Sequence, residues 1–270
     1  AALVYLEDKF SISAGVHGVF SNIAYQDAET GANARTDSPM GTPLYLYASY
    51  QATDWLAFGL GVYTPCGSSV EYEDDWAGSH LVNNIDLQAI YIQPTVSFKI
   101  NDKLSFGGGP IYVTGSVNFN RNLNRTLTDI DGNRSNVTID ASGVSNWGWV
   151  ASAMVNLTDD LHLGATYRSE IILEAEDGDA DFANIPNSPL TPFADTKFDA
   201  SLPMPAEMTV GMSYDFCESW TFAFDFNRTY WDVYNSLDID FANPAIPDSK
   251  NARNYKNASI YRFGMQYDAP

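Results

Sequence analysis

The stretch QAIYIQPTVSFKI, residues Gln88–Ile100, decides the fold class of this chain. Its large apolar side chains lie on one face of an extended backbone, at Ile90, Ile92, Val96, Phe98 and Ile100. The opposite face carries Ala89, Tyr91, Gln93, Thr95, Ser97 and Lys99. Alternation with a period of two predicts a β-strand with one apolar face.

The same alternation recurs along most of the chain. It predicts ten strands, at approximately 9–25, 42–52, 55–72, 87–100, 104–119, 146–157, 161–174, 207–216, 220–241 and 257–268. Several exceed the roughly 5–6 residues that are usual for strands of soluble sheets. Tight turns alternate with long loops at 26–41, 73–86, 120–145, 175–206 and 242–256, as in outer-membrane barrels. We therefore predict an all-β fold, a transmembrane antiparallel β-barrel.

A soluble β-sandwich would alternate in the same way and is the main alternative. In a sandwich, the solvent face would be rich in Lys and Glu, whereas here it is mostly Gly, Ser, Thr, Asn and Tyr, with the charge in the loops. Aromatic side chains also gather near the predicted strand ends, at Trp55, Trp76, Trp147, Trp149, Trp220, Tyr230 and Trp231. Such a girdle is typical of a membrane interface. Both features favour the barrel.

The composition excludes several other classes of protein. No stretch of this 270-residue chain approaches the ~18 consecutive apolar residues of a membrane helix. A formal net charge of −20 makes nucleic acid a poor partner. The two cysteines and three histidines have no metal-ligand spacing, so we expect no cofactor and no metal site. No histidine has a serine and a carboxylate in catalytic spacing, so we do not expect an enzyme.

Two acidic runs are candidates for binding Ca²⁺, because carboxylates are calcium ligands. They comprise Glu71, Glu73, Asp74 and Asp75, and Glu174, Glu176, Asp177 and Asp179. Neither has the ligand spacing of a calcium loop. We interpret both as solvated acidic loops.

Several blocks of sequence, in order along the chain, carry a resemblance to a known family. They are GLGVYTPCGSSVEY at Gly59–Tyr72, DWAG at Asp75–Gly78, LQAIYIQPTVS at Leu87–Ser97, NWGW at Asn146–Trp149, YRSE at Tyr167–Glu170, Leu202-Pro203 with Glu207-Met208, and Thr229-Tyr230-Trp231. Together they resemble the FadL/TodX family of outer-membrane transporters of long-chain fatty acids and other hydrophobic compounds. The resemblance spans nearly the whole chain.

The resemblance implies a 14-stranded barrel in the outer membrane of a Gram-negative bacterium, with an N-terminal hatch in the lumen. We expect residues 1–270 to form a single β-barrel domain holding about ten of these strands, without the hatch and the last strands. It further implies that a hydrophobic ligand enters through outer loops, binds in the lumen and leaves sideways through a kink in the third strand. The expected function is passive transport of long-chain fatty acids or similar compounds.

The third predicted strand contains a candidate for that lateral opening. Pro65 and Gly67 flank Cys66 in its middle. Proline cannot donate a ladder hydrogen bond, and glycine inside a strand often marks a bulge. The alternative is a structural irregularity without a role in transport.

Four cations are candidates for binding a ligand carboxylate, which is costly to bury alone. By the resemblance, Arg121 and Lys256 match positions where the family places pocket cations. Arg168 and Arg262 fall on the polar faces of predicted strands. The alternative for each is a lumenal charge bonded to a carboxylate such as Glu170.

Apolar residues in two long loops suggest an outer capture groove. They are Leu123 and Leu127 in loop 120–145, and Phe182, Phe193 and Phe198 in loop 175–206. The alternative is that these loops pack on themselves. The expected partners are a long-chain fatty acid or another hydrophobic small molecule, and outer-membrane lipid. A barrel that binds or presents lipid without transporting it is the alternative function.

Overall fold

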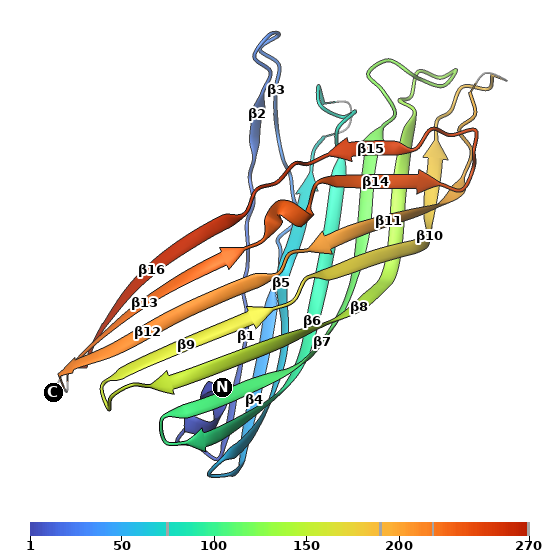
Figure 1. The fold of residues 1–270 in the computed structure, drawn as a ribbon. Helices are drawn as coiled ribbons and strands as arrows, with labels where there is room; N and C mark the ends of the chain where they lie inside the picture. The colour runs from blue at the N-terminus through green and yellow to red at the C-terminus, as the bar shows by residue number, and fades with distance from the viewer. Residues whose placement is uncertain (74–75, 189–190, 218, 269–270) are drawn as a thin grey trace.

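The computed structural model of this chain describes residues 1–73, 76–188, 191–217 and 219–268. Its main element is a long, curved antiparallel sheet (Figure 1). The first half of the chain contributes β1 (Phe10–Val16), β4 (Leu44–Thr53), β5 (Leu56–Glu71), β6 (Asn84–Asn101), β7 (Leu104–Asn122) and β8 (Asn136–Asn156). The second half contributes β9 (Leu161–Arg168), β10 (Ile171–Ala183), β11 (Thr196–Met204), β12 (Glu207–Cys217), β13 (Trp220–Thr229), β14 (Ser236–Phe241), β15 (Ser249–Ala252) and β16 (Ala258–Tyr267). A separate hairpin, β2 (Ala24–Gln26) with β3 (Asn33–Arg35), extends from one end.

The later part of the sheet is built from strands in end-to-end pairs. β9 continues into β10, β11 into β12, β13 into β14 and β15 into β16, with a short break in each. The lower members pair in the order β9–β12–β13–β16, and the upper members pair in the order β10–β11–β14–β15. Together with β1 and β4 to β8, the described chain therefore crosses the sheet ten times. The predicted all-β antiparallel fold is confirmed.

Several of the predicted loops contain strands: the segment 26–41 contains β3, and the segment 242–256 contains β15. The segment 175–206 contains most of β10 and all of β11, and the segment 120–145 contains the first part of β8. Along β10 the inward residues Leu173, Ala175 and Ala180 are buried, while the outward positions carry exposed carboxylates. The outward charge makes this strand resemble a solvated loop in the sequence.

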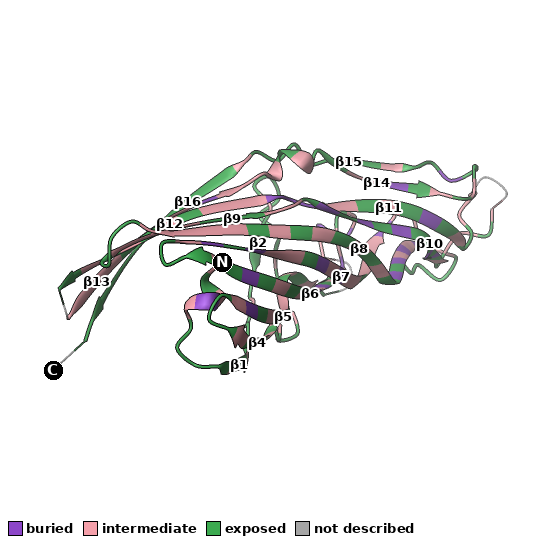
Figure 2. Cartoon of the chain, turned by 60° about the horizontal axis from the view of Figure 1, so that its bottom comes forward, coloured by how far each residue is buried: buried purple, intermediate pink, exposed green. Residues whose placement is uncertain are grey.

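The two faces of the sheet differ as the alternation predicts. On the outer face, large apolar side chains are exposed: Ile12 is 62% exposed, Phe98 38% and Phe224 41%. On the inner face Ala57, Ser97 and Ser105 are fully buried, and Figure 2 shows buried segments along the central strands. In an outer-membrane barrel the exposed apolar face contacts lipid.

A short 3₁₀ helix, η1 (Ala2–Tyr5), covers part of the inner face. The hydroxyls of Ser97 and Ser105 donate to the carbonyl of Ala1 at 2.7 and 3.1 Å, and the Ala1 amino group donates to Ser152 Oγ at 2.8 Å. These contacts explain why small polar residues are buried here. Among the described residues, no helix is long and apolar enough to cross a membrane.

Two apolar clusters hold the upper half of the curved sheet together. In the first, inward residues of β6 and β7 pack against Ile171 and Leu173 of β10 and Met204 of β11. In the second, the start of β8 packs against Phe198 of β11 and Ile239 of β14. Early and late crossings of the sheet are therefore joined through their inner faces, and this encloses a cavity.

Candidate functional site

The upper cavity lies inside the curved sheet and has a volume of about 590 Å³. Residues of β5, β6, β7, β8, β10, β11, β14 and β15 line it. Most of its wall is apolar, including Val70, Leu87, Val117, Phe119, Leu173 and Phe198. A cavity of this kind suits an apolar ligand, with the few polar groups in its wall setting the ligand's orientation.

Two arginines lie in the wall of this apolar cavity. Arg121, near the end of β7, donates from Nη2 to Ser249 Oγ at 3.2 Å. Arg253, just after β15, lies 6.0 Å from the ring centroid of Tyr234. No carboxylate among the described residues lies within ion-pair distance of Arg121. Arg121 therefore presents an uncompensated charge beside an apolar space.

The other predicted cations lie elsewhere. Lys256 is exposed and does not line the cavity. Arg262 donates to Asp225 Oδ1 at 2.7 Å, across β16 and β13, and does not line the upper cavity. Arg253 was missed because nothing in the local sequence distinguishes it from Lys256, three residues later.

Arg168 belongs to a polar cluster deeper in the lumen. Its Nη2 atom lies 2.6 Å from Glu207 Oε2, and its guanidinium lies 5.6 Å from the Tyr91 ring centroid. Asn227 Nδ2 also donates to Glu207, at 2.5 Å. The carboxylate partner is thus Glu207, and not Glu170. We call Arg168, Glu207, Asn227 and Tyr91 the Arg168 cluster.

The predicted irregularity of the third long strand is a β-bulge. Tyr63 pairs with Tyr91 of β6, but the next pair is Cys66 with Ala89, so Thr64 and Pro65 together oppose Ile90. On the other side of β5, pairing with β4 stops at Tyr63. In the described chain, no ladder partner flanks 65–70 on that side. The wall is therefore interrupted where Pro65, Cys66 and Gly67 lie.

Comparisons with known proteins agree with this architecture. A family model described as "Outer membrane protein transport protein (OMPP1/FadL/TodX)" matches residues 1–270. The chain belongs to this family. The predicted resemblance and the predicted outer-membrane location in a Gram-negative bacterium are thereby confirmed.

Individual members of the FadL/TodX family are distant in sequence. Outer membrane protein P1 of Haemophilus influenzae is 21% identical over 296 residues, and the match covers 98% of this chain and 63% of that protein. A FadL homologue of Pseudomonas aeruginosa has a TM-score of 0.76 at 17% identity, covering 100% of this chain and 71% of that one. The toluene transporter TodX of Pseudomonas putida has a TM-score of 0.69 at 19% identity, covering 100% and 74%. The chain thus spans less than two thirds of the length of the first of these relatives.

Most of the predicted capture-loop residues of this FadL/TodX-family chain lie against protein. Phe198 is 1% exposed within β11 and lines the upper cavity. Phe182 lies in β10, and its ring stacks on Phe193 at 5.5 Å. Leu123 packs on the second apolar cluster, and Leu127 is half-buried. Most of these side chains therefore pack on other parts of the described chain.

Two aromatic positions also differ from the expectation of a girdle at strand ends. Trp147 and Trp149 lie in the middle of β8, because this strand begins ten residues earlier than predicted. Both project outward, with 63% and 50% of their surface exposed. Of the acidic residues considered as calcium ligands, Asp74 and Asp75 lie outside the described residues.

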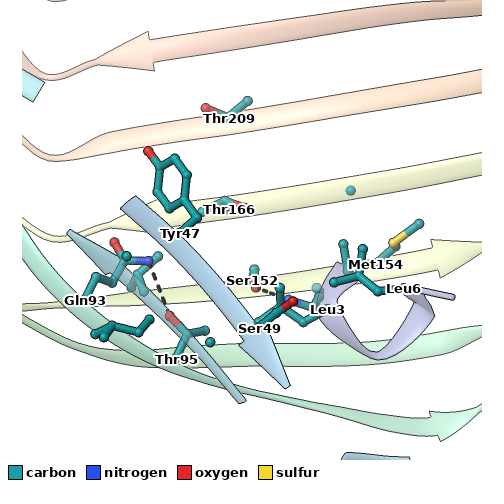
Figure 3. Close-up of a pocket in the computed structure, with 18 of the residues that line it drawn as sticks. Leu3, Leu6, Tyr47, Ser49, Gln93, Thr95, Ser152, Met154, Thr166 and Thr209 are labelled. Carbon is teal, nitrogen blue, oxygen red and sulfur yellow. Dashed lines mark hydrogen bonds between the residues drawn. The ribbon is translucent and has the colours of Figure 1, made fainter. Parts of the chain in front are cut away.

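A second, lower cavity of about 640 Å³ lies beside η1 (Figure 3). Leu3 and Leu6 face it from the N-terminal segment, and many small or polar side chains line the rest, such as Ser49, Thr95, Ser152, Thr166 and Thr209. Along β6, Ala89 lines the upper cavity and Gln93 the lower one, with Tyr91 between them. The Arg168 cluster therefore lies between the two cavities.

Proposed function

We propose that this protein transports long-chain fatty acids or similar hydrophobic compounds passively across the outer membrane. The observation that carries this proposal is Arg121, a cation without a carboxylate partner in the described chain, in the wall of an apolar cavity. A fatty acid has an apolar tail that suits the cavity and a carboxylate that can pair with Arg121. The TodX relative is named as a toluene transporter, so neutral hydrocarbons belong in the test.

The carboxylate of the ligand would bind Arg121, with Arg253 as the second cation. A charge-assisted hydrogen bond contributes about 1.5–3 kcal/mol. Lys256, three residues from Arg253 and exposed, would act earlier, during approach from the outside. Arg168 is already neutralised by Glu207, and Arg262 by Asp225, so both are second choices.

The ligand would leave sideways through the bulge of β5. Val70, in the segment of β5 without a β4 partner, lines the upper cavity, as does Ala89 opposite Cys66. An apolar tail in the cavity therefore lies close to an interrupted part of the wall. From there the ligand would enter the outer-membrane lipid.

Binding to the full-length protein in detergent tests the role of the cations. Replacing Arg121 and Arg253 together by alanine should weaken oleate binding by about tenfold to a hundredfold, because a charge-assisted bond is lost. Toluene binding should change little, since toluene has no charge. Arg262→Ala is the matched control, because it removes a cation outside the cavity. Equal loss of oleate and toluene binding would count against the carboxylate assignment.

Growth on oleate distinguishes transport from the alternative, a barrel that binds or presents lipid. Full-length protein should restore growth of a strain that lacks its own fatty acid transporter. Correct insertion should first be shown by resistance of the folded barrel to unfolding in SDS. An inserted, oleate-binding protein that fails to restore growth would support the alternative.

A further inference from the structure

The wall of the sheet is interrupted at a second place, between β8 and β10. β8 pairs with β9 from Val150 to Asn156, and with β10 only from Asn136 to Asp140. Two segments lie between these ladders: residues 141–149 of β8, and residues 169–178, which comprise the start of β10 and the two residues before it. These two segments form no ladder with each other. All of these residues are described. We call this interruption the β8–β10 seam.

Hydrogen bonds cross the seam only at its lower end. Ser169 N donates to Trp149 O at 2.9 Å, and Trp149 N donates to Ser169 Oγ at 3.0 Å. Asn146 Nδ2 donates to Ile172 O at 2.7 Å. Above Asn146, no hydrogen bond joins the two described edges until the upper ladder begins.

Backbone conformation on both edges produces the seam. Gly143 in β8 has a φ of 70°, and a Cβ there would meet no atom within 4 Å. Asp177 in β10 has a φ of 54° at an irregularity between Ala175 and Gly178, and its N–H donates to Asp199 Oδ1 at 3.0 Å. Left-handed residues interrupt the regular extended conformation that a ladder needs.

The upper cavity reaches the seam from the inside. Val144 on one edge and Leu173 and Ala175 on the other all line that cavity. Apolar side chains close the seam: the Ile171 side chain fills the space over Gly148, where a Cβ would lie 2.5 Å from it. The seam is thus closed by side-chain packing. Side chains can move without breaking the hydrogen bonds of a β-ladder.

The outer rim of the seam has the character of a membrane interface. Trp147 contacts Tyr112 at a centroid distance of 5.0 Å, and Trp149 contacts Tyr167 at 5.3 Å. Ile172 is 40% exposed on the same outer face, and the next outward residue along β10 is the exposed Glu174. Aromatic residues favour the headgroup level of a bilayer. The residues around the seam are therefore of the kind found at the boundary between hydrocarbon and headgroups.

We propose that the β8–β10 seam is a second lateral portal, through which an amphipathic lipid-like ligand exchanges between the upper cavity and the outer leaflet. Its carboxylate would stay at the level of Trp147 and the headgroups while its apolar tail passes Val144 and Leu173. This portal rests on the proposed function, since it requires the upper cavity to hold such a ligand. In the sheet, β6 and β7 separate the β5 bulge from β8, which forms one edge of the seam.

A reversible cross-link across the seam tests the portal. Ser145 and Glu174 are exposed residues on the two edges of the seam. Ser145→Cys with Glu174→Cys would be joined by a bifunctional thiosulfonate reagent in full-length protein whose Cys66 and Cys217 are replaced by serine. The matched control joins Phe98→Cys to Phe106→Cys, two outward partners in the intact β6–β7 ladder. Oleate uptake by cells and oleate binding in detergent are measured for each protein.

The decisive background is the β5 variant Pro65→Val with Gly67→Val, in which we expect the first lateral route to be closed. We expect this variant to retain measurable uptake. Cross-linking the seam should then lower that uptake at least fivefold, and reduction of the cross-link should restore it. The control cross-link should have no effect, and oleate binding should persist throughout.

Two results would overturn the portal. One is unchanged uptake when the seam is cross-linked in the β5 variant. The other is complete loss of uptake by the β5 variant alone, with binding intact, since the seam would then carry no flux. Loss of oleate binding by the unmodified protein would instead overturn the proposed function, and with it the ligand that the portal requires.

Discussion

Arg168 and Glu207 are direct cross-strand partners on β9 and β12, joined by an ion pair of 2.6 Å. The same guanidinium lies 5.6 Å from the ring of Tyr91 on β6, so this pair links late crossings of the sheet to an early one. The two side chains are 21% and 31% exposed. A polar cluster of this kind is a barrier to an apolar tail. To pass the cluster, the tail must lose its contacts with the apolar wall of the upper cavity. It therefore favours sideways exit from the upper cavity over passage toward η1.

Removing Glu207 should destabilise the folded barrel. Glu207→Ala leaves Arg168 and Asn227 without their shared acceptor, at a cost of about 1–3 kcal/mol. The free energy of unfolding, measured by urea titration in lipid vesicles, checks this. Asp225→Ala is the control, because it breaks an exposed pair with Arg262 that contributes at most about 1 kcal/mol. An equal loss in both variants would contradict a special role for the Arg168 cluster.

Restoring a ladder donor in the β5 bulge should slow transport but preserve binding. In Pro65→Val with Gly67→Val the bulged segment regains a ladder donor, and the new Cβ at position 67 lies 3.3 Å from Leu87 O, which demands only a small shift. Oleate uptake should fall severalfold, while the equilibrium constant for oleate stays within about twofold. Gly264→Val is the control, because its Cβ makes only an ordinary contact at 3.8 Å on β16. Normal uptake by a folded β5 variant would exclude this strand as the exit.

Lysine on the two faces of β6 should have different effects. Ile92 lies on the outer face and Gln93 on the inner face, where it lines the lower cavity. Lysine on a lipid face near the bilayer midplane costs about 2–4 kcal/mol, whereas lysine in a polar lumen costs much less. Folding into vesicles should therefore be weaker for Ile92→Lys than for Gln93→Lys. Similar values would be expected of a soluble sandwich and would contradict the membrane orientation.

The turn of the β2–β3 hairpin should be sensitive to acid. The Thr30 backbone N–H donates to Asp27, with further bonds from the Thr30 hydroxyl and the Glu29 N–H, and these lower the pKa of Asp27 to about 2. Since the folded pKa lies below the ordinary value of 3.8, this contribution is complete above pH 4 and is lost as the pH falls through 2. A carboxyl NMR titration should show a midpoint near 2 for Asp27. A midpoint near 4 would mean that the turn does not form.

Local pattern was sufficient to predict the wall of the barrel. The alternation of Ile90, Ile92, Val96 and Phe98 depends only on neighbouring residues, and the strand it predicts is β6. The upper part of β10 was missed because its outward residues are acidic, so one half of the alternation resembles solvent-exposed loop. The bulge at Pro65 could be located, since proline and glycine have local backbone effects.

The contacts of the candidate site were harder to predict because they depend on register. Glu207 was not recognised as the partner of Arg168, from which it is 39 residues distant. Arg253 reaches the upper cavity, and Lys256 in the same segment does not. Nothing in the sequence near Arg253 indicates this difference. Phe198 was expected in an outer groove, but it lies fully buried because β11 turns it toward the lumen. Such facts follow from which strands meet, and strand pairing is not a local property.

The bulge in β5 also has a consequence for chain length. Before it, Ala57, Gly59, Gly61 and Tyr63 face the lumen; after it, Cys66, Ser68 and Val70 do. The lumen-facing residues therefore have odd numbers before Thr64-Pro65 and even numbers after it. Because the bulge holds one extra residue, deleting Thr64 alone would leave a regular strand in which Cys66, Ser68 and Val70 still face the lumen. Deleting both Thr64 and Pro65 would instead turn every later side chain of β5 to the opposite face, much as a single-base deletion changes a reading frame.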